Sequence, residues 1–248
     1  MKYLKWIFCS LLSLLSALHL NGQSVENLDK AIEMLGKVSK TYDSGQVSFD
    51  INYTYANESQ PQILLDSLNG NIILAEGNCF SQLRNTIFLT NRRYSIAVFK
   101  EDKLMHVSRP VSKDSMDITP MQIITTSIRQ AGVKSCVITD KKEEAQIRFT
   151  FSSETAYKYM EIVLDTRNWR IQQLRYVVKS ELALEASEQP GGIYEPYALV
   201  KAIFNHYRTD DADPAVFDER QFFTRTPTAL VPVPAYEDYE VFIGSPNL

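Results

Sequence analysis

The sequence lacks the short motifs that identify most enzymes. Its 248 residues contain no G-x-S-x-G elbow, H-E-x-x-H pair, phosphate-binding P-loop or G-x-G-x-x-G turn. Histidine is also rare: His19 lies in an N-terminal segment that we expect to be removed, and His106 and His206 lie in expected strands. A lone histidine on a strand is more often structural than catalytic. We therefore expect a protein that is not an enzyme and that uses no cofactor or metal.

Basic clusters are missing as well. The chain has 26 Lys and Arg against 30 Asp and Glu, for a formal net charge of −4, and its basic residues form no stripe. This excludes nucleic acid as an expected partner. The acidic stretch at 210–213 has carboxylates that Ca²⁺ would accept, but it lacks the EF-hand spacing and glycine and favours a solvated loop.

Cysteine is scarce, and no C-x-x-C pair occurs. Cys9 lies in the N-terminal apolar run, which leaves Cys79 and Cys136. In an exported protein these two could form a disulfide, or they could be two separate buried thiols.

No apolar run is long enough to span a bilayer of about 30 Å. The longest, Trp6 to Leu18, follows Lys2 and Lys5 and precedes a polar stretch, which is the layout of a signal peptide. We expect residues 1–23 to be this signal peptide, with cleavage near Gly22 or Gln23. The mature chain would then lie in the periplasm and have no integral membrane segment.

Alternating apolar and polar residues dominate the sequence after the expected signal peptide. In QVSFDINYTY, residues 46–55, the positions 47, 49, 51, 53 and 55 are apolar or aromatic, which predicts a strand with one dry face. Residues 63–77 form either a hairpin that turns at Asn69-Gly70 or one long strand that bends there. Residues 85–109 predict three short strands. Residues 158–179 predict a hairpin with its turn at 165–168 and a possible bulge between Ile171 and Leu174.

Two segments have helical spacing instead. Residues 24–42 place Leu28, Ile32, Leu35 and Val38 on one face. Residues 117–132 begin with an N-cap threonine and a proline and end at a glycine, and they place Met121, Ile124 and Ile128 on one face.

The order of these elements resembles the bacterial periplasmic lipoprotein-carrier superfamily with the LolA/LolB-like fold. The resemblance lies in VSFDINYTY, LNGNIILAEGNCFSQL, NTIFLTNRRYSIAVFKEDKLMHVS, YMEIVLDTRNWRIQQLRY and AIFNHYRTDDADPAVFDERQFF, and it covers residues 24–226. It implies an α+β fold in which an antiparallel, incomplete β-barrel, or half-barrel, wraps around a few helices. Residues 227–248, which contain four prolines, are not explained by it, and we expect them to form a tail without regular structure.

The resemblance also implies a site. The concave face of the half-barrel would hold a lipid or the acyl chain of a lipidated protein. The expected lining residues are Phe49, Ile51, Tyr53, Ile72, Leu74, Tyr94, Met121, Ile124 and Ile128.

Two other interpretations stay open. The same residues could meet in a closed, dry core, since small barrels can be filled by side chains. Alternatively, the protein could be an accessory or scaffold protein of the cell envelope that uses the fold for protein contacts. Its tail, with Tyr236, Tyr239 and Phe242, would then be a docking segment.

Overall fold

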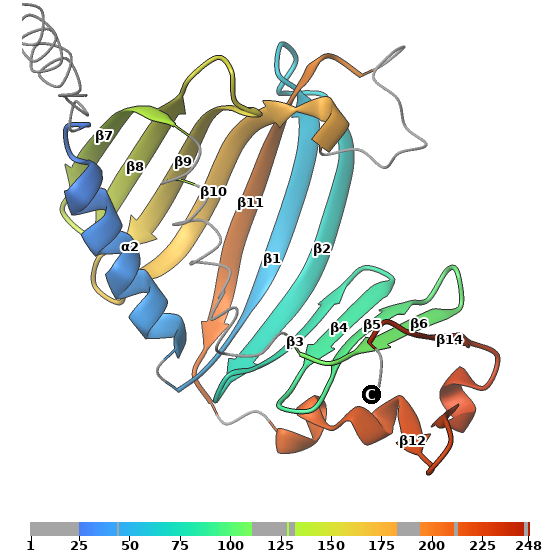
Figure 1. Cartoon of the computed structure of the whole chain (residues 1–248). Helices are drawn as coiled ribbons and strands as arrows, with labels where there is room; N and C mark the ends of the chain where they lie inside the picture. The colour runs from blue at the N-terminus through green and yellow to red at the C-terminus, as the bar shows by residue number, and fades with distance from the viewer. Residues whose placement is uncertain are drawn as a thin grey trace, which may run out of the picture.

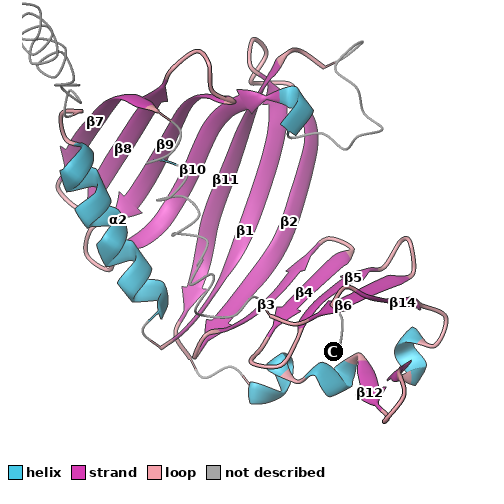
Figure 2. Ribbon diagram, in the orientation of Figure 1, coloured by secondary structure: helices cyan, strands magenta, loops and turns pink. Residues whose placement is uncertain are grey.

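One large sheet forms most of the protein. The structure, a computed structural model, describes residues 25–43, 45–110, 128, 132–182, 194–210, 213–245 and 248. Within these residues, twelve strands form the large sheet, and a separate pair, β12 and β13, lies beside it (Figures 1 and 2). The expected signal peptide and residues Met121 and Ile124 lie outside the described residues.

The first strands of the large sheet are β1 (Gln46–Asn57), β2 (Leu64–Ala75), β3 (Asn78–Leu83), β4 (Thr86–Thr90), β5 (Ser95–Phe99) and β6 (Leu104–Ser108). The later ones are β7 (Val133–Lys141), β8 (Glu144–Phe151), β9 (Tyr157–Asp165), β10 (Arg170–Lys179), β11 (Tyr197–Arg208) and β14 (Glu240–Ile243). The separate pair is β12 (Phe223–Arg225) and β13 (Leu230–Pro232). Helical segments are α2 (Leu28–Asp43) and the short 3-10 turns η2 (Ser180–Leu182), η3 (Pro214–Phe217), η4 (Glu219–Gln221) and η5 (Pro234–Tyr236).

The large sheet consists of two meanders joined by one strand. Its order is β14-β6-β5-β4-β3-β2-β1-β11-β10-β9-β8-β7, so β11 connects the meander β1–β6 to the meander β7–β10. Every pairing in it is antiparallel except that of β14 with β6. The sheet ends at β14 and β7 and does not close, and it curls around the face that carries α2 (Figure 1). The expected α+β half-barrel is therefore confirmed.

Two hydrophobic cores lie on opposite faces of this sheet. Helix α2 buries Ala31, Met34, Leu35 and Val38 against apolar residues of β7, β8, β9 and β10 on the concave face. On β3–β6 the opposite face is buried instead, by Phe222 and Phe223 and the C-terminal segment that lies below these strands in Figure 1. The sheet thus buries its concave face at one end and its opposite face at the other end.

Residues 64–75 form one long strand, and the hairpin alternative is not observed. Gly70 lies inside β2 opposite Leu83 of β3. A Cβ atom at Gly70 would overlap the carbonyl oxygen of Gln82 and would lie 2.5 Å from Cδ2 of Leu83. Glycine is therefore required here because β3 approaches its backbone closely. The bulge expected after Ile171 is confirmed, as the β9–β10 register shifts between Ile171 and Gln173.

The expectation of an irregular C-terminal tail is wrong. Residues 230–243 form β13, η5 and β14, and β14 joins the sheet beside β6. Tyr236 packs on Phe222 with ring centroids 5.6 Å apart, and Tyr239 packs on Tyr236. The tail is ordered because its aromatic residues complete the second core.

Cys79 and Cys136 are both free thiols. They lie on β3 and β7, which are separated along the sheet by seven strand spacings of about 4.8 Å. A disulfide needs Cα atoms about 6 Å apart, so the alternative of two separate thiols is the one observed.

Candidate functional site

The strand register brings the main expected site residues onto one face. In β1, Phe49 lies opposite Ile72 of β2, and Val47 lies opposite Leu74. Directly paired residues share a face, so Phe49, Ile51, Tyr53, Ile72 and Leu74 lie together on the concave face. Five of the nine residues expected from the sequence are therefore neighbours on two adjacent strands.

The same face continues across β11 and β10. Tyr53 lies opposite Ala202 of β11, which lies opposite Leu174 of β10, and Tyr176 lies opposite Val200 in the same way. We call the surface over these four strands the apolar trough. Its residues are Leu68, Ile72, Leu74, Phe49, Ile51, Tyr53, Val200, Ala202, Phe204, Leu174 and Tyr176.

Residue size shapes the trough. The residues that β11 presents along its middle are small: Ala198, Val200 and Ala202 are at most 7% exposed. The strands on either side present large side chains, including Tyr53 on β1 and Tyr176 on β10. The face therefore carries small side chains along β11 between larger, aromatic ones on β1 and β10.

One end of the trough is closed by helix α2. Phe49 packs against Tyr42 of α2, Phe204 and Tyr207, with ring centroids 5.1–5.8 Å apart. The Tyr207 hydroxyl donates to the Ile171 carbonyl over 2.7 Å and lies 2.6 Å from the Tyr42 hydroxyl, which accepts from the Ile171 amide over 3.3 Å. These bonds satisfy the backbone at the β10 bulge and attach the end of α2 to the sheet.

The rest of the trough stays partly open. Phe49 and Ile51 are only 4% and 1% exposed, whereas Tyr53, Ile72, Leu74 and Tyr176 keep intermediate exposure. Burial raises the pKa of Tyr53, and it raises the pKa of Tyr176 to about 12, with a smaller contribution from the nearby Tyr53 and Tyr157. The trough residues include no charged side chain, and their tyrosines stay neutral at physiological pH, so the surface suits an uncharged, apolar ligand.

The remaining expected residues are distributed differently. Ile128 is 1% exposed and packs in the core with α2, and Met121 and Ile124 lie outside the described residues. Tyr94 lies away from the trough. It precedes β5 and packs edge-to-face on Phe223 in the second core, with ring centroids 5.3 Å apart. The difference arises because β3–β6 bury the opposite face of the sheet.

That residues of β10 and β11 belong to the trough was not predicted from the sequence. The alternation of Leu174, Tyr176 and Val178, and that of Ala198, Val200 and Ala202, is visible in the sequence. It did not identify a site because the sequence does not show that β11 lies between β1 and β10. That pairing joins residues about 150 positions apart.

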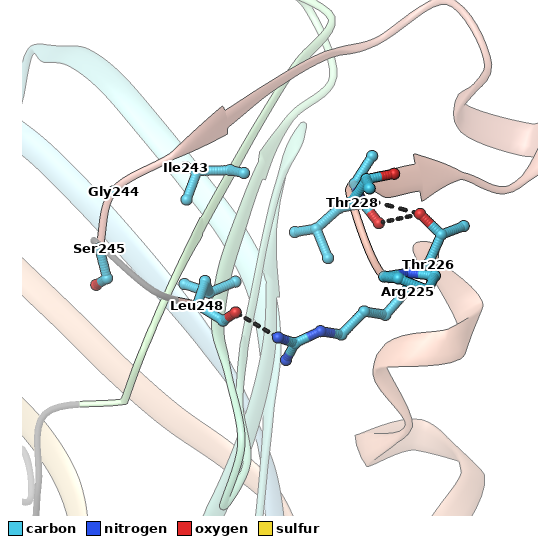
Figure 3. A pocket seen from close by; sticks show the side chains of 10 residues that line it. Arg225, Thr226, Thr228, Ile243, Gly244, Ser245 and Leu248 are labelled. Atoms are coloured by element: carbon cyan, nitrogen blue, oxygen red, sulfur yellow. Dashed lines mark hydrogen bonds between the residues drawn. The ribbon is translucent and has the colours of Figure 1, made fainter.

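Two hollows among the described residues lie away from the trough. One of about 420 Å³ lies between the β12–β13 turn and the end of β14 (Figure 3). Its guanidinium, Arg225, already donates to the carbonyl of Leu248 over 2.5 Å and to the Tyr94 hydroxyl over 3.3 Å. A second, of about 370 Å³, is lined by Arg93 and Glu219, which pair with each other. In both, these charged groups bond to residues of the C-terminal segment.

The described residues offer little for metal or acid–base chemistry. They contain no group of three or more His, Cys, Asp or Glu placed to hold a metal ion. His206 is paired with Asp50 over 2.8 Å on the strand surface. From the acidic stretch, Asp213 caps η3 by accepting the Ala215 amide. Among the described residues, no helix has both the length and the apolar character that crossing a membrane requires.

Comparison with known proteins identifies similar folds only. No protein-family model matches the sequence, and no curated protein matches it. Among solved structures, an uncharacterized conserved protein from Thermus thermophilus is 9% identical, with a TM-score of 0.46 over 86% of this chain and 99% of that one. A LolA superfamily protein from Nitrosomonas europaea is 10% identical, with a TM-score of 0.35 over 77% and 99%. A chain of the MucA/MucB complex of Pseudomonas aeruginosa is 11% identical, with a TM-score of 0.37 over 82% and 63%. These are similarities in the course of the chain, at 9–11% identity.

Proposed function

We propose that this chain is an exported, non-enzymatic binding protein that shields the apolar part of a lipid or lipidated protein in its trough. The observation that carries the proposal is the gradient of exposure along one face. Phe49 and Ile51 are buried, while Tyr53, Ile72 and Leu74 beside them remain partly exposed. A filled core would bury all five.

The energetics favour an acyl ligand. Moving one methylene group from water to an apolar surface gains about 0.8 kcal/mol. An acyl chain that covers the open part of the trough would remove apolar surface of both the ligand and the protein from water. A bound apolar group needs no charged contact, which agrees with the uncharged lining.

The test is binding of a fluorescent fatty-acid analogue, 11-(dansylamino)undecanoic acid, to the purified protein. Ile72→Gln puts an amide on the open wall, which an apolar ligand must desolvate, so we expect the affinity to fall about tenfold. Val137→Gln is the matched control: this residue is also a β-branched strand residue and is 55% exposed, but it points away from the concave face. Equal affinities for both variants and the unsubstituted protein would refute a site in the trough.

A second candidate function, protein contact in the envelope, is favoured by the sheet edge at β14. The amides of Glu240 and Gly244 donate to β6 and its preceding residue, so by alternation those of Val241 and Ile243 point away from the sheet. Phe242 and Ile243 are 56% and 50% exposed. An unpaired edge with exposed apolar residues can accept a partner strand.

The edge has its own test. Ile243→Pro removes one outward amide while leaving the inward amides that hold β14, and Ile243→Val keeps the amide. A partner that binds by strand addition should be captured from envelope extracts by the Val variant and lost with the Pro variant. Capture by both would reject this mode of contact.

A further inference from the structure

Two sets of tyrosines on the concave face differ in how their hydroxyl groups are used. Tyr42 and Tyr207 use their hydroxyl groups within the protein, where they bond to each other and to the backbone of Ile171. The hydroxyls of Tyr53, Tyr157 and Tyr176 make no hydrogen bond with any residue that the structure describes. Two of these three residues line the trough, and Tyr157 of β9 adjoins it.

The three tyrosines lie on the same face of neighbouring strands. The Tyr157 and Tyr176 rings meet edge-on with centroids 5.9 Å apart. Tyr53 is opposite Ala202 of β11, whose neighbour two positions earlier, Val200, is opposite Tyr176, and after burial the Tyr53 and Tyr157 hydroxyls contribute to the raised pKa of Tyr176. The chain therefore gathers three protonated hydroxyl donors on an otherwise apolar surface.

Packing alone does not explain these hydroxyls. The same face uses phenylalanine at Phe49, Phe149, Phe151 and Phe204, where a ring is needed without a polar group. None of the three hydroxyls is among the buried side-chain atoms that have no partner, and all three residues keep intermediate exposure. Each hydroxyl can therefore donate to water or to a ligand, which phenylalanine at positions 53, 157 and 176 could not do.

We propose that Tyr53, Tyr157 and Tyr176 bind a carbonyl acceptor next to the acyl chain, so that the trough selects acyl esters over hydrocarbon or ether chains of the same length. A tyrosine hydroxyl donates one hydrogen bond, which the carbonyl oxygen of an ester can accept because it projects sideways from the chain; the ether has no projecting oxygen at this position, and its only acceptor lies within the chain. Without a ligand, water accepts the hydrogen bonds that these hydroxyls donate, and the ligand displaces this water. This inference rests on the proposed function and names its ligand class.

The experiment compares two lipids that differ only at this group. Dipalmitoyl phosphatidylglycerol and its dihexadecyl ether counterpart each compete with 11-(dansylamino)undecanoic acid for the purified protein. A net hydrogen bond corresponds to a difference of about threefold to tenfold, so the ester should displace the probe at correspondingly lower concentration. In the double variant Tyr53→Phe/Tyr176→Phe, the affinity for the ester lipid should fall to that for the ether lipid. The affinity for the ether lipid should be unchanged.

The control is Tyr159→Phe. Tyr159 lies on β9 two positions after Tyr157 but on the other face, where its ring lies 4.2 Å from the Arg148 guanidinium. This variant should keep the preference for the ester. The melting temperature of the double variant should equal or exceed that of the unsubstituted protein, because the hydroxyls it removes have no described protein partner.

Three results would overturn the inference. Equal displacement by ester and ether in the unsubstituted protein would show that no acceptor is recognised. A double variant that weakens both lipids equally would show that the rings act only by shape. Failure of both lipids to displace a bound probe would reject this ligand class. Failure of the probe itself to bind would instead refute the proposed function.

Discussion

At the scale of single residues, Gly70 fixes how closely β2 and β3 approach each other. Gly70→Ala would place a methyl group against the Gln82 carbonyl and Leu83, so we expect it to lower the free energy of unfolding by about 1–3 kcal/mol or more. Gly36→Ala is the control, because Gly36 lies inside α2 with nothing within 4 Å of the added atom. It should stabilise the protein by about 0.5–1 kcal/mol. Urea unfolding measures both, and two changes of the same sign would contradict this packing.

At the scale of elements, the attachment of α2 depends on its last turn. Tyr207→Phe removes the hydroxyl that links Tyr42 to the Ile171 carbonyl, so the carbonyl loses this donor and the Tyr42 hydroxyl keeps only its bond from the Ile171 amide. We expect a loss of about 1–3 kcal/mol in the free energy of unfolding and faster amide exchange in α2 than in β8. Unchanged exchange in α2 would show that its apolar face alone holds it.

The same bond predicts a dependence on pH. Burial, followed by Tyr42, raises the pKa of Tyr207 above its ordinary value of 10.0. A raised pKa means that the folded protein holds this proton more tightly, so the resulting stability is complete below about pH 10 and is lost as the pH rises further. The difference in unfolding free energy between the unsubstituted protein and Tyr207→Phe should therefore be constant from pH 7 to 9 and shrink above pH 10.

Strands and hairpins could be predicted from the sequence where the alternation of apolar residues lies within the segment itself. The alternation of Phe49, Ile51 and Tyr53 predicts both the strand and its dry face, and the β9–β10 hairpin with its bulge follows from residues close in sequence. The tail was not predictable from local pattern, because Tyr236 and Val241 are ordered by contacts with Phe222 and β6. Such contacts depend on the whole arrangement rather than on local propensity.

At the scale of the whole molecule, the sheet changes the face that it buries. Ile72 and Ile73 are successive residues of β2, yet Ile72 faces the trough and Ile73 packs against the second core. Because of this change, Tyr94 belongs to the second core, although β5, which follows it, alternates like β1. Periodicity reports that a strand has a dry face but does not report which side of a sheet is covered.

The proposed role of the molecule requires that the trough holds a ligand. The most direct measurement is lipid extraction and mass spectrometry of the mature protein, purified from a bacterial periplasm without detergent. We predict an acyl-ester lipid at close to one molecule per chain, reduced in the Ile72→Gln variant and retained in Val137→Gln. Preparations free of lipid that also fail to take up lipid from vesicles would contradict the proposed role.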